Sequence, residues 1–249
     1  MILLLDIGNT RVKWACYQDG VLIQTGNFAH SLDSLGATLK SEWGQIIPQR
    51  ILMSNVASDK IAAAIAVWAN ENWKITADIV KSQKQGFGVV NSYEEPQQLG
   101  ADRWAALIAA KHLNVGAACV IDCGSAITID AIAANGMHLG GLIAPGLEMM
   151  RNSLVAKTHN IKPMPKINNL TSFALGHDTR SGIMMGTLYS AAAFIDRAVN
   201  DVSTIMNLSM TNIITGGDAK EVLPMLKGSY QFQPHLVLLG LSVIASKKL

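Results

Sequence analysis

The sequence has few cysteines and no long apolar run, and each shortage excludes a class of protein. The three cysteines (Cys16, Cys119 and Cys123) are odd in number and form no CxxC pair, so we expect no disulfide framework and predict a cytoplasmic protein. No apolar stretch approaches the roughly 20 residues that a membrane-spanning helix needs, and the first residues lack the basic region of a secretory signal. We therefore expect no membrane partner.

Charged residues are also scarce, at 15% of the 249 residues. The formal net charge is only +2, which argues against nucleic acid as a partner, because binding a polyanion needs a basic face. The 49% share of hydrophobic residues is sufficient for a sizeable core and too high for a disordered chain. The low charge also suggests that a second subunit covers part of the surface.

Three common catalytic motifs are absent. The sequence contains no Walker A motif, no GxGxxG and no HExxH. P-loop kinases, Rossmann dehydrogenases and zinc proteases of the HExxH type are therefore poor candidates. The six histidines and eleven methionines show no spacing that indicates a site.

The two halves of the sequence share one plan. In each half an apolar strand, at Ile2–Leu5 or Ala118–Ile121, runs into an Asp-x-Gly loop. Two more strands follow, joined by Asp-Gly in the first half and Asn-Gly in the second, which are strong hairpin signals. Asp122 follows Asp6 by 116 residues, nearly half the chain. So long a period suits a duplicated domain and not a solenoid.

Periodicity places further elements in both halves. Helices are expected at Asp59–Asn72, at Gly100–Asn114 with Asp102 as its cap, and at Gly182–Asn200; strands at Ile51–Val56, Ile75–Val80, Asn212–Thr215 and Leu236–Leu239; and a loop at Pro163–Leu170. The expected fold is α/β, with two duplicated domains, residues 1–114 and 115–249, and a cleft between them.

The two Asp-x-Gly loops are candidate phosphate-binding sites. Glycines at positions 8 and 124 lack the Cβ that would hold backbone N–H groups away from a phosphate. A cation at the two aspartates could bridge them, directly or through water, to a polyphosphate. Further donors are offered by Asn9, Thr10, Lys13 and Ser125. A plain strand-ending turn would explain either loop alone, but two matching loops favour a nucleotide site.

A third glycine-containing loop spans residues 215–219. Gly216 and Gly217 follow an apolar strand and precede a helix-like segment, so a flat ring could lie against the backbone there. The N-terminus of the following helix would favour an anion. An ordinary strand-to-helix turn capped by Asp218 is the alternative.

Four motifs resemble those of the type III pantothenate kinases. Residues 6–13 match the phosphate motif D-x-G-N-T-x-x-K, and residues 122–128 match D-x-G-T-A-x-T with Ser125 in place of the first threonine. Residues 215–219 match the adenosine motif T-G-G-x-A, and residues 100–103 match the substrate motif G-x-D-R. The motifs follow the family's order across the whole chain. The resemblance implies two RNase H-like domains of the actin-like ATPase superfamily, which includes acetate and sugar kinases.

The resemblance also implies a reaction, the ATP-dependent phosphorylation of pantothenate to 4′-phosphopantothenate, which is the first step of coenzyme A synthesis. Members of the family are cytoplasmic homodimers that need Mg2+ and a monovalent cation, K+ or NH4+. Two alternatives stay open: another small-molecule kinase of the superfamily, and a non-catalytic nucleotide-binding regulator. A sugar kinase would need more polar groups than residues 100–103 provide, and a regulator would bind ATP without turnover.

The same resemblance implies roles for individual residues. Asp102 would be the catalytic base that orients the substrate hydroxyl, Asp122 would hold the monovalent cation, and Asp6 would hold Mg2+ through water. Implied ATP contacts are Asp6, Gly8, Asn9, Thr10, Lys13, Gly124, Ser125, Gly216 and Gly217. Implied substrate contacts are Tyr93, Gly100, Ala101, Asp102, Arg103 and, across the dimer interface, Thr179, with residues 140–146 as a glycine-rich wall nearby.

Plainer interpretations of several of these residues stay open. Tyr93 could be a half-buried loop aromatic, Arg103 a surface residue, and Thr179 a first-turn helix residue. Strand-end turns would explain the glycines of residues 140–146.

Overall fold

The computed structural model describes residues 1–157 and 174–247, which divide into two compact units. The first unit holds Met1–Asn114 and the segment that begins at His235, and the second holds Val115–Pro234. Within the described residues, no helix combines the length and the apolar character needed to cross a bilayer. The loop predicted at Pro163–Leu170 lies outside the described residues.

The first unit is built on a five-stranded mixed sheet with the order β3-β2-β1-β4-β5. β1, β2 and β3 are antiparallel neighbours, whereas β4 and β5 run parallel to β1. The strands are β1 (Ile2–Ile7), β2 (Arg11–Gln18), β3 (Val21–Ala29), β4 (Arg50–Asn55) and β5 (Asp78–Ile79). The predicted hairpin between β2 and β3 is confirmed, because Asp19 and Gly20 have φ values of 51° and 86°, as a two-residue hairpin turn requires.

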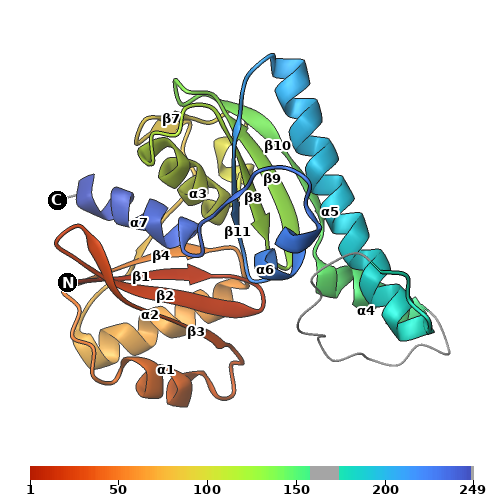
Figure 1. The fold of residues 1–249 in the computed structure, drawn as a ribbon. Coiled ribbons are helices and arrows are strands. Elements are labelled where there is room, and N and C mark those ends of the chain that lie inside the picture. Colours follow the sequence, from red (N-terminus) through yellow and green to blue (C-terminus); the bar gives the residue numbers. More distant parts are fainter. Residues whose placement is uncertain (158–173, 248–249) are drawn as a thin grey trace. The chain divides into compact units, whose positions relative to one another are not determined.

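Helices cover both faces of this sheet (Figure 1). On one face, α1 (Leu35–Trp43) and α2 (Asp59–Trp73) enclose a core in which the Trp43 ring contacts four other aromatic rings. On the other face, α3 (Ala101–His112) and α7 (Leu236–Lys247) pack against each other and against β4 and β1. A small ribbon of β6 (Gln85–Gly86) and β7 (Val89–Val90) and a 3-10 turn (Pro96–Gln98) precede α3.

The strand predicted at Leu236–Leu239 is wrong, since these residues form the first turn of α7. Their continuous apolar run has no period that separates a buried strand from a buried helix. Gly240 lets α7 approach α3, because an ideal Cβ at this glycine would collide with the carbonyl of Ala105. The sequence-based division assigned residues 115–249 to one domain, whereas α7 packs within the first unit.

The second unit repeats the sheet of the first, with the order β10-β9-β8-β11-β12 and the same strand directions. Its strands are β8 (Ala118–Cys123), β9 (Ala126–Ile132), β10 (His138–Pro145), β11 (Thr211–Thr215) and β12 (Gln231–Phe232). Its helices are α4 (Leu147–Lys157), α5 (Thr179–Met206) and α6 (Ala219–Val222), followed by a 3-10 turn (Leu223–Met225). The two sheets therefore have the same topology, as a duplicated domain predicts.

The long helix α5 extends beyond the predicted Gly182–Asn200 at both ends. Asp178 caps its start, accepting a hydrogen bond from the Ser181 N–H at 2.7 Å, and Asn207 ends it in the left-handed conformation. Its buried face packs on β8, β9 and β11 through an apolar core. The helices predicted at Asp59–Asn72 and Gly100–Asn114 are confirmed as α2 and α3.

Candidate functional site

The first Asp-x-Gly loop follows β1, the central strand of the first unit. Asp6 is buried, with 8% of its surface exposed, near the end of that strand. The Gly8 N–H donates to the carbonyl of Arg11 at 3.0 Å and closes the loop. Asn9 and Thr10 are exposed at the tip. The loop therefore presents polar groups to solvent above a buried carboxylate.

The pairing of β1 with β2 places Lys13 beside the first Asp-x-Gly loop. Lys13 lies directly opposite Asp6 in the register of β1 and β2, so both side chains project from the same face. His235 precedes α7 and lies within the electrostatic influence of the Lys13 amine. Burial, followed by the positive charge of Lys13, lowers the pKa of His235 below its ordinary value. Both effects favour the neutral form of the His235 imidazole. Sequence analysis missed it, because its position depends on α7 packing within the first unit.

The G-x-D-R motif begins α3 and includes a buried arginine. Arg103 is 7% exposed, which excludes the interpretation as a surface residue. Its Nη1 donates to the Tyr93 hydroxyl at 3.0 Å, and its guanidinium lies 5.8 Å from the centre of that ring. The Asp102 Oδ1 accepts from the Arg103 N–H at 2.7 Å. The structure thus brings the predicted Tyr93, Asp102 and Arg103 together.

Asp102 is not the cap of α3, which corrects the prediction. The N-cap position belongs to Gly100, and Asp102 is the second residue of the helix, following Ala101. An ideal Cβ at Gly100 would lie 2.5 Å from the Asp102 Oδ1, so a larger residue here would displace this carboxylate from its position. The positive end of the helix dipole stabilises a negative charge there.

Two side chains that the sequence analysis missed support this motif. The Ser82 hydroxyl donates to the Leu99 carbonyl at 2.7 Å, immediately before the motif. Asn91 accepts from the Tyr93 N–H at 3.0 Å and donates to the Pro96 carbonyl at 3.1 Å. No spacing pattern reveals such side-chain contacts to the backbone.

The G-x-D-R motif and the first phosphate loop lie at the same edge of the sheet. Val56, just past β4, donates its N–H to the Ile7 carbonyl at 3.0 Å. Its Cγ1 is 3.6 Å from the position of an ideal Cβ on Gly100. Because β1 and β4 are parallel, their carboxyl ends meet, and α3 begins beside them.

The second Asp-x-Gly loop follows β8 in the second unit. The Gly124 N–H donates to the Ala126 carbonyl at 3.0 Å, and the exposed Ser125 lies between them. Asp122 lies opposite Thr128 in the register of β8 and β9, as Asp6 lies opposite Lys13. The loop is one residue shorter than its counterpart in the first unit.

The T-G-G loop packs directly on this second loop. Gly216 has φ +101°, and an ideal Cβ on it would lie 2.5 Å from the Asp122 Oδ1. The Asp218 N–H donates to the Cys123 carbonyl at 2.9 Å. Gly217 is exposed with open space around it. The structure therefore brings the second phosphate motif and the adenosine motif together in the second unit.

The carboxylates of this loop affect the pKa of the buried Cys123 thiol. Burial, followed by the nearby carboxylates of Asp122 and Asp218, raises the pKa of Cys123 far above its ordinary value. The thiol is therefore neutral at physiological pH, and we assign it to the core.

The donor set at the two loops suits hard cations. Asp6 and Asp122 carry carboxylate oxygens, which hard cations such as Mg2+ prefer as ligands. Among the described residues, no group of three His, Cys, Asp or Glu side chains gathers into a metal centre. A cation at either aspartate would therefore complete its shell with water, backbone or phosphate oxygens.

Thr179 is the first residue of α5 and is exposed. The predicted glycine-rich wall at residues 140–146 forms most of β10, and its last member, Gly146, braces the second loop by donating its N–H to the Ser125 carbonyl at 3.1 Å. The other residues of this segment lie in β10, which is an edge strand of the sheet in the second unit.

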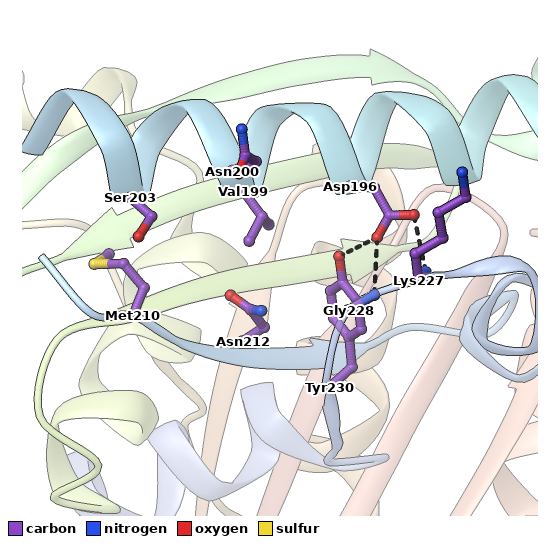
Figure 2. A pocket seen from close by; sticks show the side chains of 9 residues that line it. All are labelled: Asp196, Val199, Asn200, Ser203, Met210, Asn212, Lys227, Gly228 and Tyr230. Carbon is purple, nitrogen blue, oxygen red and sulfur yellow. Dashed lines mark hydrogen bonds between the residues drawn. The ribbon is translucent and has the colours of Figure 1, made fainter. Parts of the chain in front are cut away.

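A cavity of about 380 Å3 lies elsewhere in the second unit, between α5 and the start of β11 (Figure 2). Asp196 forms one wall and accepts hydrogen bonds from the Lys227 and Gly228 N–H groups and the Tyr230 hydroxyl. Asn212 lines the cavity at the amino end of β11, whereas the T-G-G loop follows the carboxyl end of that strand. None of the predicted site residues lines this cavity, so it is not part of the candidate site.

Known proteins are similar to this chain in sequence and in fold. A family model described as Type III pantothenate kinase matches residues 2–201. A type III pantothenate kinase of Nitrosococcus oceani is 38% identical, over 98% of this chain and 94% of its own length. One of Alcanivorax borkumensis is 32% identical over the full length of both chains.

Solved structures with lower identity show the fold. A Baf family transcriptional activator from Campylobacter jejuni has a TM-score of 0.62 at 20% identity, covering 99% of this chain and 98% of its own. Component A of the (R)-2-hydroxyglutaryl-CoA dehydratase of Acidaminococcus fermentans has a TM-score of 0.60 at 16% identity, with the same coverage. These matches confirm the predicted α/β fold. The chain belongs to the type III pantothenate kinase family.

Proposed function

We propose that this chain transfers the γ-phosphoryl group of ATP to the primary hydroxyl of pantothenate, an early reaction of coenzyme A synthesis. A bond forms between the hydroxyl oxygen and the γ-phosphorus, the bond from that phosphorus to the β-phosphate bridging oxygen breaks, and the hydroxyl proton leaves. The observation that carries the proposal is the meeting of the G-x-D-R motif and the first phosphate loop at one sheet edge, in a chain of this family.

Asp102 is the proposed catalytic base. Phosphoryl transfer asks for little covalent work, so the carboxylate chiefly orients the hydroxyl and accepts its proton late. The structure supports this role by fixing the carboxylate: Arg103 donates its N–H to Oδ1, and Gly100 leaves the space that the group occupies. A fixed acceptor costs less ordering when the substrate binds.

The proposed pantothenate contacts gather around the buried Arg103. Its guanidinium, held by the Tyr93 hydroxyl, supplies positive charge to the substrate carboxylate or to the moving phosphoryl group. Gly100 and Ala101 bring the backbone of the helix start beside it. Within the described residues, these groups offer too few donors and acceptors for the many hydroxyls of a sugar, which favours pantothenate over a sugar as substrate.

The proposed ATP contacts belong to the two phosphate motifs and the adenosine motif. Gly8, Asn9, Thr10 and Lys13 in the first unit, and Gly124, Ser125, Gly216 and Gly217 in the second, would contact the nucleotide. Asp6 would hold Mg2+ through water, and Asp122 would hold K+ or NH4+. A cation bound at these positions would neutralise charge on the phosphate oxygens. The oxygen-rich donor set of both loops supports this assignment.

We also propose a homodimer in which Thr179 contacts the substrate of the partner subunit. Support comes from the surface of the second unit. β10 is the edge strand of its sheet, and Leu142 and Ile143 on it are 45% and 64% exposed, as is Tyr189 of α5 at 54%. An exposed apolar edge strand is a common pairing surface. The three free buried thiols fit the reducing cytoplasm, which we propose as the compartment.

A coupled assay of ADP release tests the function. Release should depend on pantothenate and stay at background with acetate or glucose. Release with glucose or acetate and none with pantothenate would favour another kinase of the superfamily. ATP binding without turnover on any small alcohol would favour the regulator.

A further inference from the structure

In each unit, one residue outside the four motifs makes a hydrogen bond to the Asp-x-Gly loop. In the first unit Ala29, the last residue of β3, pairs with Arg11, so His30 is the next residue along the chain. In the second unit Pro145, the last residue of β10, pairs with Ala126, and Gly146 is the next residue. His30 and Gly146 therefore occupy equivalent positions of the duplicated fold.

Both residues make a hydrogen bond to a carbonyl of the adjoining loop. The His30 Nε2 lies 2.8 Å from the Gly8 carbonyl oxygen, and because a carbonyl only accepts, Nε2 carries the hydrogen. In the second unit the Gly146 N–H donates to the Ser125 carbonyl at 3.1 Å. A side chain performs in one loop what the backbone performs in the other.

The extra length of the first loop accounts for this difference. Its glycine bonds to the carbonyl of the third residue beyond it, whereas Gly124 bonds to the second. The loop with the longer span is the one braced by a side chain, and an imidazole reaches further than a backbone N–H. A glycine is required at the shorter loop, since an ideal Cβ at Gly146 would lie 2.6 Å from the Ser125 carbonyl oxygen.

The bond to His30 sets the direction of one peptide plane. Both backbone polar groups of Gly8 are engaged, the N–H with Arg11 and the carbonyl with His30. In a planar trans peptide the next N–H points opposite to the carbonyl, so the Asn9 N–H points away from His30. Among the described residues, this N–H donates to no backbone or side chain. It is an oriented donor at the tip of a loop that we expect to bind phosphate.

We propose that His30 is a positioning residue for ATP: by holding the Gly8 carbonyl, it aims the Asn9 N–H at a phosphate oxygen. This inference rests on the proposed function, in which the first loop binds ATP. His30 itself does not touch the nucleotide or the reacting atoms. Its effect is on the order of one hydrogen bond and is confined to ATP, because the G-x-D-R motif is held by other contacts.

The test compares His30→Leu, which removes the donor, with His30→Gln, whose amide N–H can reach the same carbonyl. His30→Leu should raise both the KM for ATP and the Kd for ATP measured by calorimetry about three- to tenfold, the effect of one net hydrogen bond. The KM for pantothenate should stay within about twofold, and His30→Gln should restore most of the ATP affinity. Ser31→Ala, at the exposed neighbour, is the control and should change none of these constants.

Unchanged ATP affinity in His30→Leu would overturn the inference. Equal losses in the leucine and glutamine variants, accompanied by a lower Tm in both, would also overturn it, because they would indicate a packing role. Failure of the proposed function is distinguishable, since the wild-type protein would then release no ADP with pantothenate. The calorimetric comparison of ATP binding would still decide the role of His30 in that case.

Discussion

Gly216 lies so close to Asp122 that an ideal Cβ on the glycine would be 2.5 Å from the carboxylate Oδ1. Gly216 follows β11 and Asp122 lies near the end of β8, and the carboxyl ends of these parallel strands meet in the sheet of the second unit. The absence of a side chain at position 216 thus lets the adenosine motif and the proposed cation ligand share one surface.

Gly216→Ala should damage this arrangement. Its φ of +101° strains any residue with a Cβ by on the order of 2 kcal/mol, and the new atom would also meet the Cys123 carbonyl. We expect the Tm to fall by several degrees, about 2–4 °C for each kcal/mol, and the KM for ATP to rise. Gly217→Ala is the matched control for stability, because its Cβ would meet nothing within 4 Å. Equal Tm values for the two variants would contradict this account of Gly216.

Asp102→Asn should lower kcat by about 10²-fold or more, the usual contribution of a general base, while the KM for ATP stays nearly unchanged. The amide keeps an oxygen for the Arg103 N–H, so the helix start should remain folded. Steady-state kinetics with a Tm measurement checks both points. A variant with wild-type kcat would remove Asp102 from the catalytic role.

Activity should depend on K+ or NH4+ if Asp122 holds a monovalent cation. Replacing K+ by Na+ should reduce kcat/KM strongly, and Asp122→Asn should be inactive in either salt. Removal of Mg2+ by a chelator should abolish turnover independently of the monovalent ion. Undiminished rates in buffers with Na+ as the sole monovalent cation would refute the assignment of Asp122.

Tyr93→Phe should weaken pantothenate binding without affecting ATP. The variant loses the hydroxyl that accepts from the Arg103 Nη1 at 3.0 Å but keeps the ring beside the guanidinium. The net loss of one hydrogen bond, about 1 kcal/mol, predicts a rise of roughly fivefold in the KM for pantothenate. Arg103→Lys should cost more, because a lysine has no planar group to span the same partners. A KM for pantothenate that neither variant alters would exclude both side chains from the substrate site.

Alkaline pH should destabilise the fold through its buried thiols. Burial raises the pKa of Cys119 from 9.0 to about 11. The unfolded chain therefore ionises first as the pH rises, so this contribution is complete below pH 9 and is lost towards pH 11, on the order of 2 kcal/mol. Urea unfolding at pH 7 and pH 10 measures the loss. Cys119→Ala should show a smaller decrease than wild type, and an equal decrease would contradict this origin.

Much of the fold could be predicted from local signals. The Asp19-Gly20 pair indicates a hairpin because few other residues adopt two successive positive φ values, and both are observed. The apolar strands before Asp6 and Asp122 are buried as expected. The repeat of this plan predicts the second sheet, whose order and directions are the same as in the first.

The errors and omissions come from contacts between residues far apart in the sequence. Leu236–Leu239 is apolar throughout, and its packing against α3, which no local pattern encodes, makes it a helix. His30 is 22 residues from the carbonyl that it contacts. His235 approaches Lys13 through the tertiary packing of the chain segment before α7. The motifs thus predict the chemistry of the loops, whereas the groups that hold them require the tertiary structure.

The central claim is transfer of the γ-phosphoryl group to pantothenate, and 31P NMR of the reaction mixture tests it most directly. The account predicts that the ATP signals are replaced by those of ADP and, in equal amount, of a phosphate monoester coupled to a CH2 group. Asp102→Asn in the same experiment should leave both products near background. Inorganic phosphate with no monoester, or unchanged ATP in the presence of pantothenate, Mg2+ and K+, would contradict it.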